Sequence, residues 1–117
     1  SWVASPLSAS ITPSSTSSKI LIRYDSHIYQ YSGVQAASTI YRDSTEVTSQ
    51  TTGLCKSWYD TTRGHFPHNG QFLDSPSTTS AITYTVYVKK LSGDYDISYP
   101  TNADTEYCTI TLMEVAG

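Results

Sequence analysis

Apolar and polar residues alternate along three long stretches of the chain, which is the pattern of a β-strand with one buried face. The stretch Ala81–Lys89 shows it most clearly, and its expected core face consists of Ile82, Tyr84, Val86 and Val88. The same alternation gives two further core faces, which consist of Ile20, Ile22 and Tyr24 near the start and of Cys108, Ile110 and Leu112 near the end. We expect these three faces to meet in one core.

The chain as a whole is predicted to be all-β, because no long window shows the i, i+3, i+4, i+7 spacing of a helix. Turns rich in Gly, Pro, Asp, Asn and Ser separate the expected strands. The strands are Ser8–Thr12, Lys19–Tyr24, Ile28–Tyr31, Ser38–Arg42, Leu54–Tyr59, Gln71–Leu73, Ala81–Lys89, Tyr95–Tyr99 and Glu106–Val115. Regularly spaced strands of this kind favour a small antiparallel β-sandwich, jelly-roll-like in type.

A chain of 117 residues fits one domain, and residues 8–117 are expected to form it. Residues 1–7 are expected to be an extended N-terminal arm. Its apolar side chains Trp2, Val3 and Leu7 need a surface to lie on, which a neighbouring subunit would supply. Because Met113 is the first methionine, we interpret the chain as the C-terminal or processed part of a longer protein.

Composition excludes some classes of partner. Ser and Thr make up about a third of the residues, and the net charge is −3 with a pI near 5.4. The seven Lys and Arg residues are scattered, which argues against nucleic acid as a partner because phosphate contacts need clustered positive charge. No apolar run has the length of a membrane-spanning helix, so no membrane insertion is expected.

The two cysteines leave their redox state open. Cys55 and Cys108 both lie in strand-like stretches, where a free cysteine behaves as a small buried apolar residue. A Cys55–Cys108 disulfide is the alternative, although two cysteines are too few for a disulfide scaffold.

The stretch Thr61–Gly70 is expected to be the longest loop, and it holds two of the three histidines. Loops on a β-scaffold commonly carry the binding residues, and Tyr combines a large rigid face with a polar tip. The residues expected to bind a ligand at this loop and its neighbours are Tyr59, Arg63, His65, Phe66, His68, Tyr95 and Tyr99.

Neither a metal site nor catalysis is expected. Pro67 separates His65 from His68, and no carboxylate or cysteine lies close to them in sequence. The acidic turns at residues 92–96 and 102–106 lack the full spacing of a calcium loop, so ordinary turn chemistry explains them. No serine lies in a Gly-x-Ser-x-Gly elbow. We therefore expect a protein without a cofactor that is not an enzyme.

Three segments, Ser8–Ile22, Asp74–Val86 and Cys108–Val115, together resemble the C-terminal β-domains of bacteriophage tail-fibre and other virion-surface proteins. The resemblance implies a structural protein on the virion surface that forms a homo-trimer, contacts other virion proteins and binds a host surface glycan or protein. The chain departs from the family pattern at Tyr107-Cys108 and in its crowded tyrosines, which puts any shared ligand in doubt.

Two other functions agree with the same residues. A capsid decoration or adaptor protein would use residues 1–7 as its docking arm. A carbohydrate-binding module would share the sandwich and the loop tyrosines, and it would bind a polysaccharide as a monomer.

Overall fold

The computed structural model describes residues 1–59, 64–93, 97 and 108–117. Within these residues it contains strands and no helix, so the all-β prediction is confirmed. The strands are β1 (Val3–Ile11), β2 (Lys19–Gln30), β3 (Val34–Arg42), β4 (Thr45–Glu46), β5 (Cys55–Tyr59), β6 (Gly64–Asp74), β7 (Ile82–Ser92) and β8 (Thr109–Val115).

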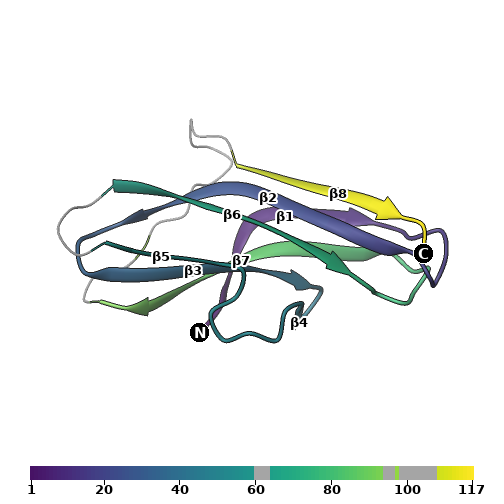
Figure 1. Ribbon diagram of the computed structural model, residues 1–117, viewed down its shortest axis with the longest axis horizontal. Coiled ribbons are helices and arrows are strands. Elements are labelled where there is room, and N and C mark those ends of the chain that lie inside the picture. The colour runs from purple at the N-terminus through teal and green to yellow at the C-terminus, as the bar shows by residue number, and fades with distance from the viewer. Residues whose placement is uncertain (60–63, 94–96, 98–107) are drawn as a thin grey trace.

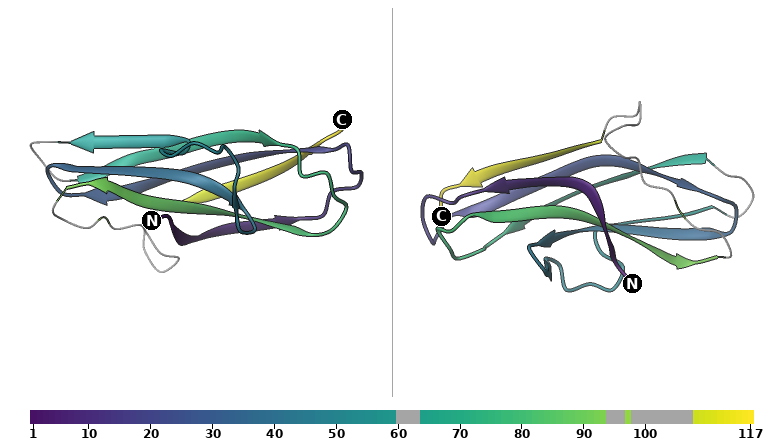
Figure 2. Two further views of the ribbon diagram at one scale, coloured as in Figure 1. Left: turned by 90° about the horizontal axis from the view of Figure 1, so that it is seen from below. Right: turned by 180° about the vertical axis from the view of Figure 1, so that it is seen from behind.

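The strands form two antiparallel sheets, which lie one over the other as two layers (Figures 1 and 2). In sheet A the order is β1-β7-β3, and the short β4 and β5 both pair with the remaining edge of β3. In sheet B the order is β6-β2-β8, so the long β2 is the central strand. The predicted β-sandwich is confirmed.

The core lies between the sheets and consists of the faces that alternation predicts. Buried side chains from sheet B (Ile20, Ile22 and Tyr24) meet those from sheet A (Ile40, Ile82, Tyr84 and Val86). Ile110 and Leu112 of β8 are partly buried and pack against this cluster. Val88 belongs to a second, smaller cluster with Ile28 and Ala36. The predicted core residues therefore face inward, except that Cys108 belongs to neither cluster.

Three expected boundaries are wrong. Residues 3–7 are not a separate arm but the start of β1, which pairs with β7. β2 does not stop at Tyr24 but continues to Gln30, and the expected loop Thr61–Gly70 is strand from Gly64 onward. Of the expected strand Tyr95–Tyr99, only residue 97 is described.

The two cysteines are half-buried and are not joined to each other, so the disulfide alternative is not formed in this structure. Cys55 lies at the start of β5, opposite Ser38 of β3. Cys108 directly precedes β8.

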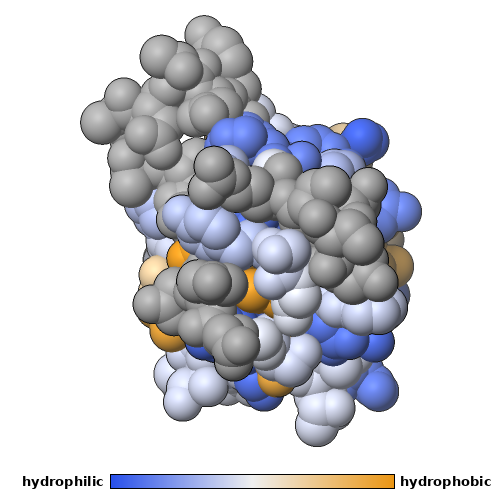
Figure 3. Space-filling view, turned by 90° about the vertical axis from the view of Figure 1, so that its left-hand side faces the viewer, coloured by the Kyte–Doolittle hydropathy of each residue, from blue (hydrophilic) through white to orange (hydrophobic). Residues whose placement is uncertain are grey.

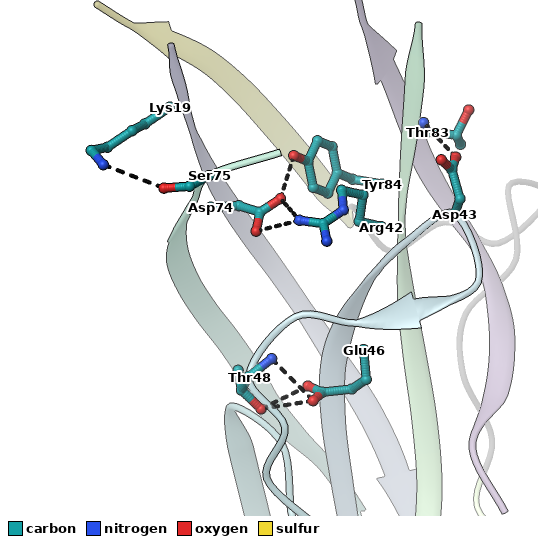
Figure 4. Close-up of polar contacts among 9 residues, drawn as sticks. All are labelled: Lys19, Arg42, Asp43, Glu46, Thr48, Asp74, Ser75, Thr83 and Tyr84. Carbon is teal, nitrogen blue, oxygen red and sulfur yellow. Dashed lines mark hydrogen bonds and ion pairs between the residues drawn. The ribbon is translucent and has the colours of Figure 1, made fainter. Parts of the chain in front are cut away.

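A polar cluster joins the two sheets where β6 ends (Figure 4). Both carboxylate oxygens of Asp74 lie 2.7 Å from Nη1 of Arg42, which ends β3. The Tyr84 hydroxyl of β7 donates to Asp74 Oδ2 at 2.7 Å. Burial raises the pKa of Tyr84, and the neighbouring Asp74 carboxylate raises it further. Asp74 is thus a buried charge with two hydrogen-bonding partners.

Glu46 organises the segment between β4 and β5, which closes the edge of β3 (Figure 4). Its carboxylate accepts hydrogen bonds from the Thr39 hydroxyl, from the Thr48 hydroxyl and backbone N–H, and from the Ser49 N–H. Burial raises the pKa of Glu46, but these hydrogen bonds outweigh burial and lower it below its usual value. Val47 and Leu54 of the same segment pack against the core.

Candidate functional site

The structure does not bring the predicted binding residues together on one loop. His65, Phe66 and His68 lie in β6, and Tyr59 is the last residue of β5. Arg63, Tyr95 and Tyr99 lie outside the described residues. Because side chains alternate along a strand, β6 directs His65 to the outer face of sheet B and directs Phe66 and His68 inward.

His68 is fully buried, so the expectation that it contacts a ligand at the surface is wrong. Its Nδ1 lies 2.8 Å from the Ser38 hydroxyl, and its Nε2 lies 2.6 Å from the Ser57 hydroxyl. Ser38 also lies 2.7 Å from the Tyr24 hydroxyl, and Ser57 donates to Gln30 Oε1. We call these five residues the polar chain.

The polar chain has one consistent set of proton positions. Gln30 Nε2 donates to the Val34 carbonyl at 2.9 Å, so Gln30 Oε1 is the acceptor of the Ser57 proton. Ser57 must then accept from Nε2–H of His68, and His68 Nδ1 accepts from Ser38. Ser38 in turn accepts from Tyr24. The histidine is therefore neutral, and burial lowers its pKa from 6.5 to about 4.

A serine hydroxyl 2.6 Å from a histidine nitrogen is also the geometry of a nucleophile and its base. Here the direction of the hydrogen bonds opposes that role, because the Ser57 proton points to Gln30 and His68 Nε2 is itself a donor. The polar chain joins β3 and β5 of sheet A to β2 and β6 of sheet B. Its evident effect is to connect the two sheets.

The structure does not place the predicted oligomer-contact residues on one exposed surface. Leu7 packs against the core, and Val3 is 60% exposed. Trp2 is half-buried, with the Lys89 ammonium 5.4 Å from its ring centroid. Gly53 has a φ of +68°. A methyl group there would come within 3.0 Å of the Trp2 ring and within 2.7 Å of the Ser38 carbonyl oxygen in β3. Trp2 therefore lies on its own chain, and only Val3 remains as an exposed apolar contact.

The outer face of sheet B carries a group of exposed polar side chains on two adjacent strands. Arg23 and Asp25 of β2 lie in register with Gln71 and Asn69 of β6, so four polar side chains project from adjacent strands. We call these four residues the polar row. Arg23 Nε and Asp25 Oδ2 form an exposed ion pair at 3.3 Å.

Two shallow depressions lie along the polar row. One, of about 330 Å³, is lined by the four polar residues together with Tyr24 and Gly70. The other, of about 390 Å³, extends across β2 to Thr111 and Met113 of β8. Both share Arg23, Asp25 and Gln71, so the outer face offers one continuous, open surface across three strands.

Aromatic rings flank the polar row at the end of β2. The His65 ring lies edge to face with His27 and with Tyr29, at centroid distances of 5.0 and 4.9 Å. Tyr29 has a similar contact with Tyr31 at 5.4 Å. Seen from this end of the sandwich, most of the coloured surface is hydrophilic or of intermediate hydropathy, and its hydrophobic areas are small (Figure 3). Of the predicted binding residues that the structure describes, His65 lies beside the polar row.

The sequence does not predict the polar row as a group, although the alternation of polar and apolar residues indicates one of its members. Alternation in Lys19–Tyr24 already directs Arg23 away from the core. Asn69 and Gln71 were assigned to a loop and to a three-residue strand, and nothing local indicates that they pair with β2. Only the long β2–β6 ladder brings the four side chains together.

Neither a family model, a curated protein nor a solved structure matches the chain. In the described ranges, no three His, Cys, Asp or Glu side chains are grouped to hold one metal ion. The same ranges contain no helix long and apolar enough to cross a membrane.

Proposed function

We propose that this chain is a non-catalytic recognition domain on a virion surface, which binds a host surface glycan through the polar row. The sequence resemblance to bacteriophage fibre domains supports the virion setting. One observation supports the site: the polar row presents a guanidinium, a carboxylate and two amides side by side on an exposed, shallow surface.

The chemistry of the polar row suits a sugar. Neighbouring hydroxyls of a pyranose are both donors and acceptors, and the polar row offers Asp25 as an acceptor, Arg23 as a donor and Gln71 as both. Asn69 adds a donor, because its Oδ1 already accepts from the Ser26 N–H at 3.2 Å. Hydrogen bonds to the charged members are stronger than neutral ones. The rings of Tyr29 and His65 add apolar faces at one end of the row. An open surface across three strands favours an extended saccharide over a small enclosed ligand.

The polar chain supports the non-catalytic part of the proposal. The ring of His68 contacts two serine hydroxyls, those of Ser38 and Ser57, and both serines are fixed by further hydrogen bonds. A catalytic base would need an acceptor nitrogen directed at the nucleophile. The acceptor nitrogen of His68 is Nδ1, and it faces Ser38, whose fully buried hydroxyl no substrate can reach, whereas Nε2 directs a donor at Ser57.

The test is binding to an array of bacterial surface glycans, followed by calorimetry on the best ligand. Asp25→Ala and Gln71→Ala should each weaken binding, with Asp25→Ala losing about tenfold to a hundredfold because a hydrogen bond to a charged group contributes about 1.5–3 kcal/mol. Thr85→Ala, on the outer face of sheet A, is the control and should bind like the parent. Equal affinities for all variants would reject the polar row as the site.

The other candidate functions give different results in the same assay. A carbohydrate-binding module should bind a polysaccharide as a monomer, whereas a fibre domain should gain affinity from several linked copies. A decoration or adaptor protein should bind no glycan, and it should lose attachment to virion proteins when the exposed Val3 is replaced with Asp. The expected homo-trimer remains a prediction, and sedimentation of the parent chain tests it.

A further inference from the structure

Strand β8 is an edge of sheet B. On one side it pairs with β2 in an unbroken register, from Thr109 opposite Asp25 to Val115 opposite Lys19. On its other side no strand pairs with it among the residues that the structure describes. A free strand edge presents backbone N–H and C=O groups to any strand that approaches.

The other long edge strands carry features that discourage such pairing. β6 has Pro67 in its middle, which lacks an N–H donor. β1 contains Pro6, and its register with β7 shifts between Ala4 and Ser8. β8, with the sequence Thr-Ile-Thr-Leu-Met-Glu-Val, has no proline, glycine, lysine or bulge. It is therefore the least protected long edge of the sandwich.

The outer face of β8 carries exposed apolar side chains towards its C-terminal end, and Lys19 and Arg23 of β2 lie opposite Val115 and Thr111. Met113 and Val115 of β8 are 56% and 37% exposed, and Leu73, on the same outer face of sheet B, is 48% exposed. The single charge of the strand is Glu114, whose Oε2 accepts hydrogen bonds from the N–H and the hydroxyl of Ser14 at 2.8 and 2.7 Å. The edge thus offers backbone pairing and apolar contact, and its one charge is already hydrogen-bonded.

We propose that β8 pairs antiparallel with β8 of a second copy of this chain, about a two-fold axis at Leu112. This register uses all seven residues of the strand and joins two copies of sheet B into one six-stranded sheet. It places Thr109 opposite Val115 and Thr111 opposite Met113, so threonine methyl groups meet apolar side chains on the outer face. Glu114 falls opposite Ile110, so no like charges face each other across the ladder.

A second copy is the occupant that this pattern fits. Two-fold pairing uses the same surface on both partners, and it requires a strand that complements itself. The alternating threonine and aliphatic residues of β8 meet that requirement. This inference concerns assembly and stands independently of glycan binding.

The test is the mass in solution over a concentration series, compared with the 12.9 kDa of one chain. The parent should form a dimer, or a hexamer if the expected homo-trimer forms as well; a trimer alone would contradict the pairing of β8. Thr111→Lys should raise the dissociation constant at least about tenfold, because each added lysine lies beside the two-fold axis on the edge strand. Met113→Lys, at the position opposite Thr111, should have the same effect.

Gln71→Lys is the matched control. Gln71 and Thr111 flank the same Arg23 on the outer face of sheet B, but Gln71 lies on the opposite edge strand. It should leave the dimer unchanged, and circular dichroism should show all three variants folded. A monomeric parent, a species whose mass Thr111→Lys does not change, or equal dissociation by Gln71→Lys would each overturn the proposal.

Discussion

At the scale of single residues, His68 links the interior of the sandwich to pH. It is neutral and fully buried, and it is hydrogen-bonded through both ring nitrogens to serines of sheet A. Protonation would make Nδ1 a donor, whereas the polar chain requires an acceptor there. His68 therefore binds a proton less readily in the folded state than in the unfolded chain.

Acid should destabilise the protein through His68. Its folded pKa of about 4 lies below the usual 6.5, so between these values the unfolded chain binds a proton and the folded chain does not. The free energy of unfolding should be unaffected by His68 above about pH 7, fall as the pH drops through 6.5 towards 4, and lose about 3 kcal/mol in total. Urea unfolding at several pH values measures this loss.

The control for this prediction is His68→Gln, which does not titrate. Its stability at pH 7 is expected to be lower, but its curve should be flatter than that of the parent between pH 6.5 and 4. Glu46, whose pKa is also lowered, contributes a further loss in acid that both proteins share. Parallel curves would assign the acid sensitivity to groups other than His68.

Gly70 is predicted to be irreplaceable for steric reasons. It lies opposite Tyr24 in the β2–β6 ladder, and a Cβ atom there would come within 2.7 Å of Tyr24 Cε1 and 2.9 Å of its hydroxyl oxygen. Tyr24 cannot move without leaving Ser38, so Gly70→Ala should lower the free energy of unfolding by about 1–3 kcal/mol. Thermal unfolding measures the change. Gly64→Ala, in the same strand with no atom within 4 Å, should have almost no effect.

At the scale of elements, strands with a uniform apolar face were predictable and β6 was not. Ile20, Ile22 and Tyr24 form a face that hydropathy alone detects. The inward positions of β6 include His68 and Gly70, which interrupt the apolar pattern and resemble a loop. His68 can be buried there because Ser38, distant in the sequence, hydrogen-bonds to it. Gly70 fits there because the Tyr24 ring fills the space that a side chain would take. Local sequence does not contain that information.

The cluster of Asp74, Arg42 and Tyr84 should hold the ends of β6, β3 and β7 together. Asp74→Ala should lower the free energy of unfolding by about 3 kcal/mol, because it leaves a partly buried guanidinium without its carboxylate. Tyr84→Phe removes one hydrogen bond and should lower it by only about 1–2 kcal/mol. Denaturant titration gives both values.

An exposed ion pair provides the comparison for this cluster. Arg23→Ala breaks the Arg23–Asp25 pair, whose side chains are 64% and 47% exposed. Water already screens such a pair, so the expected change in stability is below about 0.5 kcal/mol. If Asp74→Ala lowered the free energy of unfolding no more than Arg23→Ala does, the cluster would not stabilise the contact between the sheets.

At the scale of the whole molecule, the sandwich is a slab with extents of 48 × 30 × 18 Å. Such a slab has room for one buried layer between its sheets, so every second side chain of each strand lies on an outer face. This geometry explains why a domain so rich in Ser and Thr still has an apolar core between its sheets. It also makes the outer faces of both sheets the largest surfaces for contact with other molecules.

The pairing of the first strands with the last ones has a consequence for biosynthesis. Ser5 of β1 donates a hydrogen bond to Val86 of β7, 81 positions away, and Ser14 donates one to Glu114 of β8, 100 positions away. Contacts that are so distant along the chain form slowly, because a large loop must close first. During translation β1 cannot pair with β7, and β2 cannot pair with β8, until those later strands have left the ribosome. The nascent chain therefore exposes the core faces of its first strands for most of its synthesis, and the sandwich can close only after Val115 has been made.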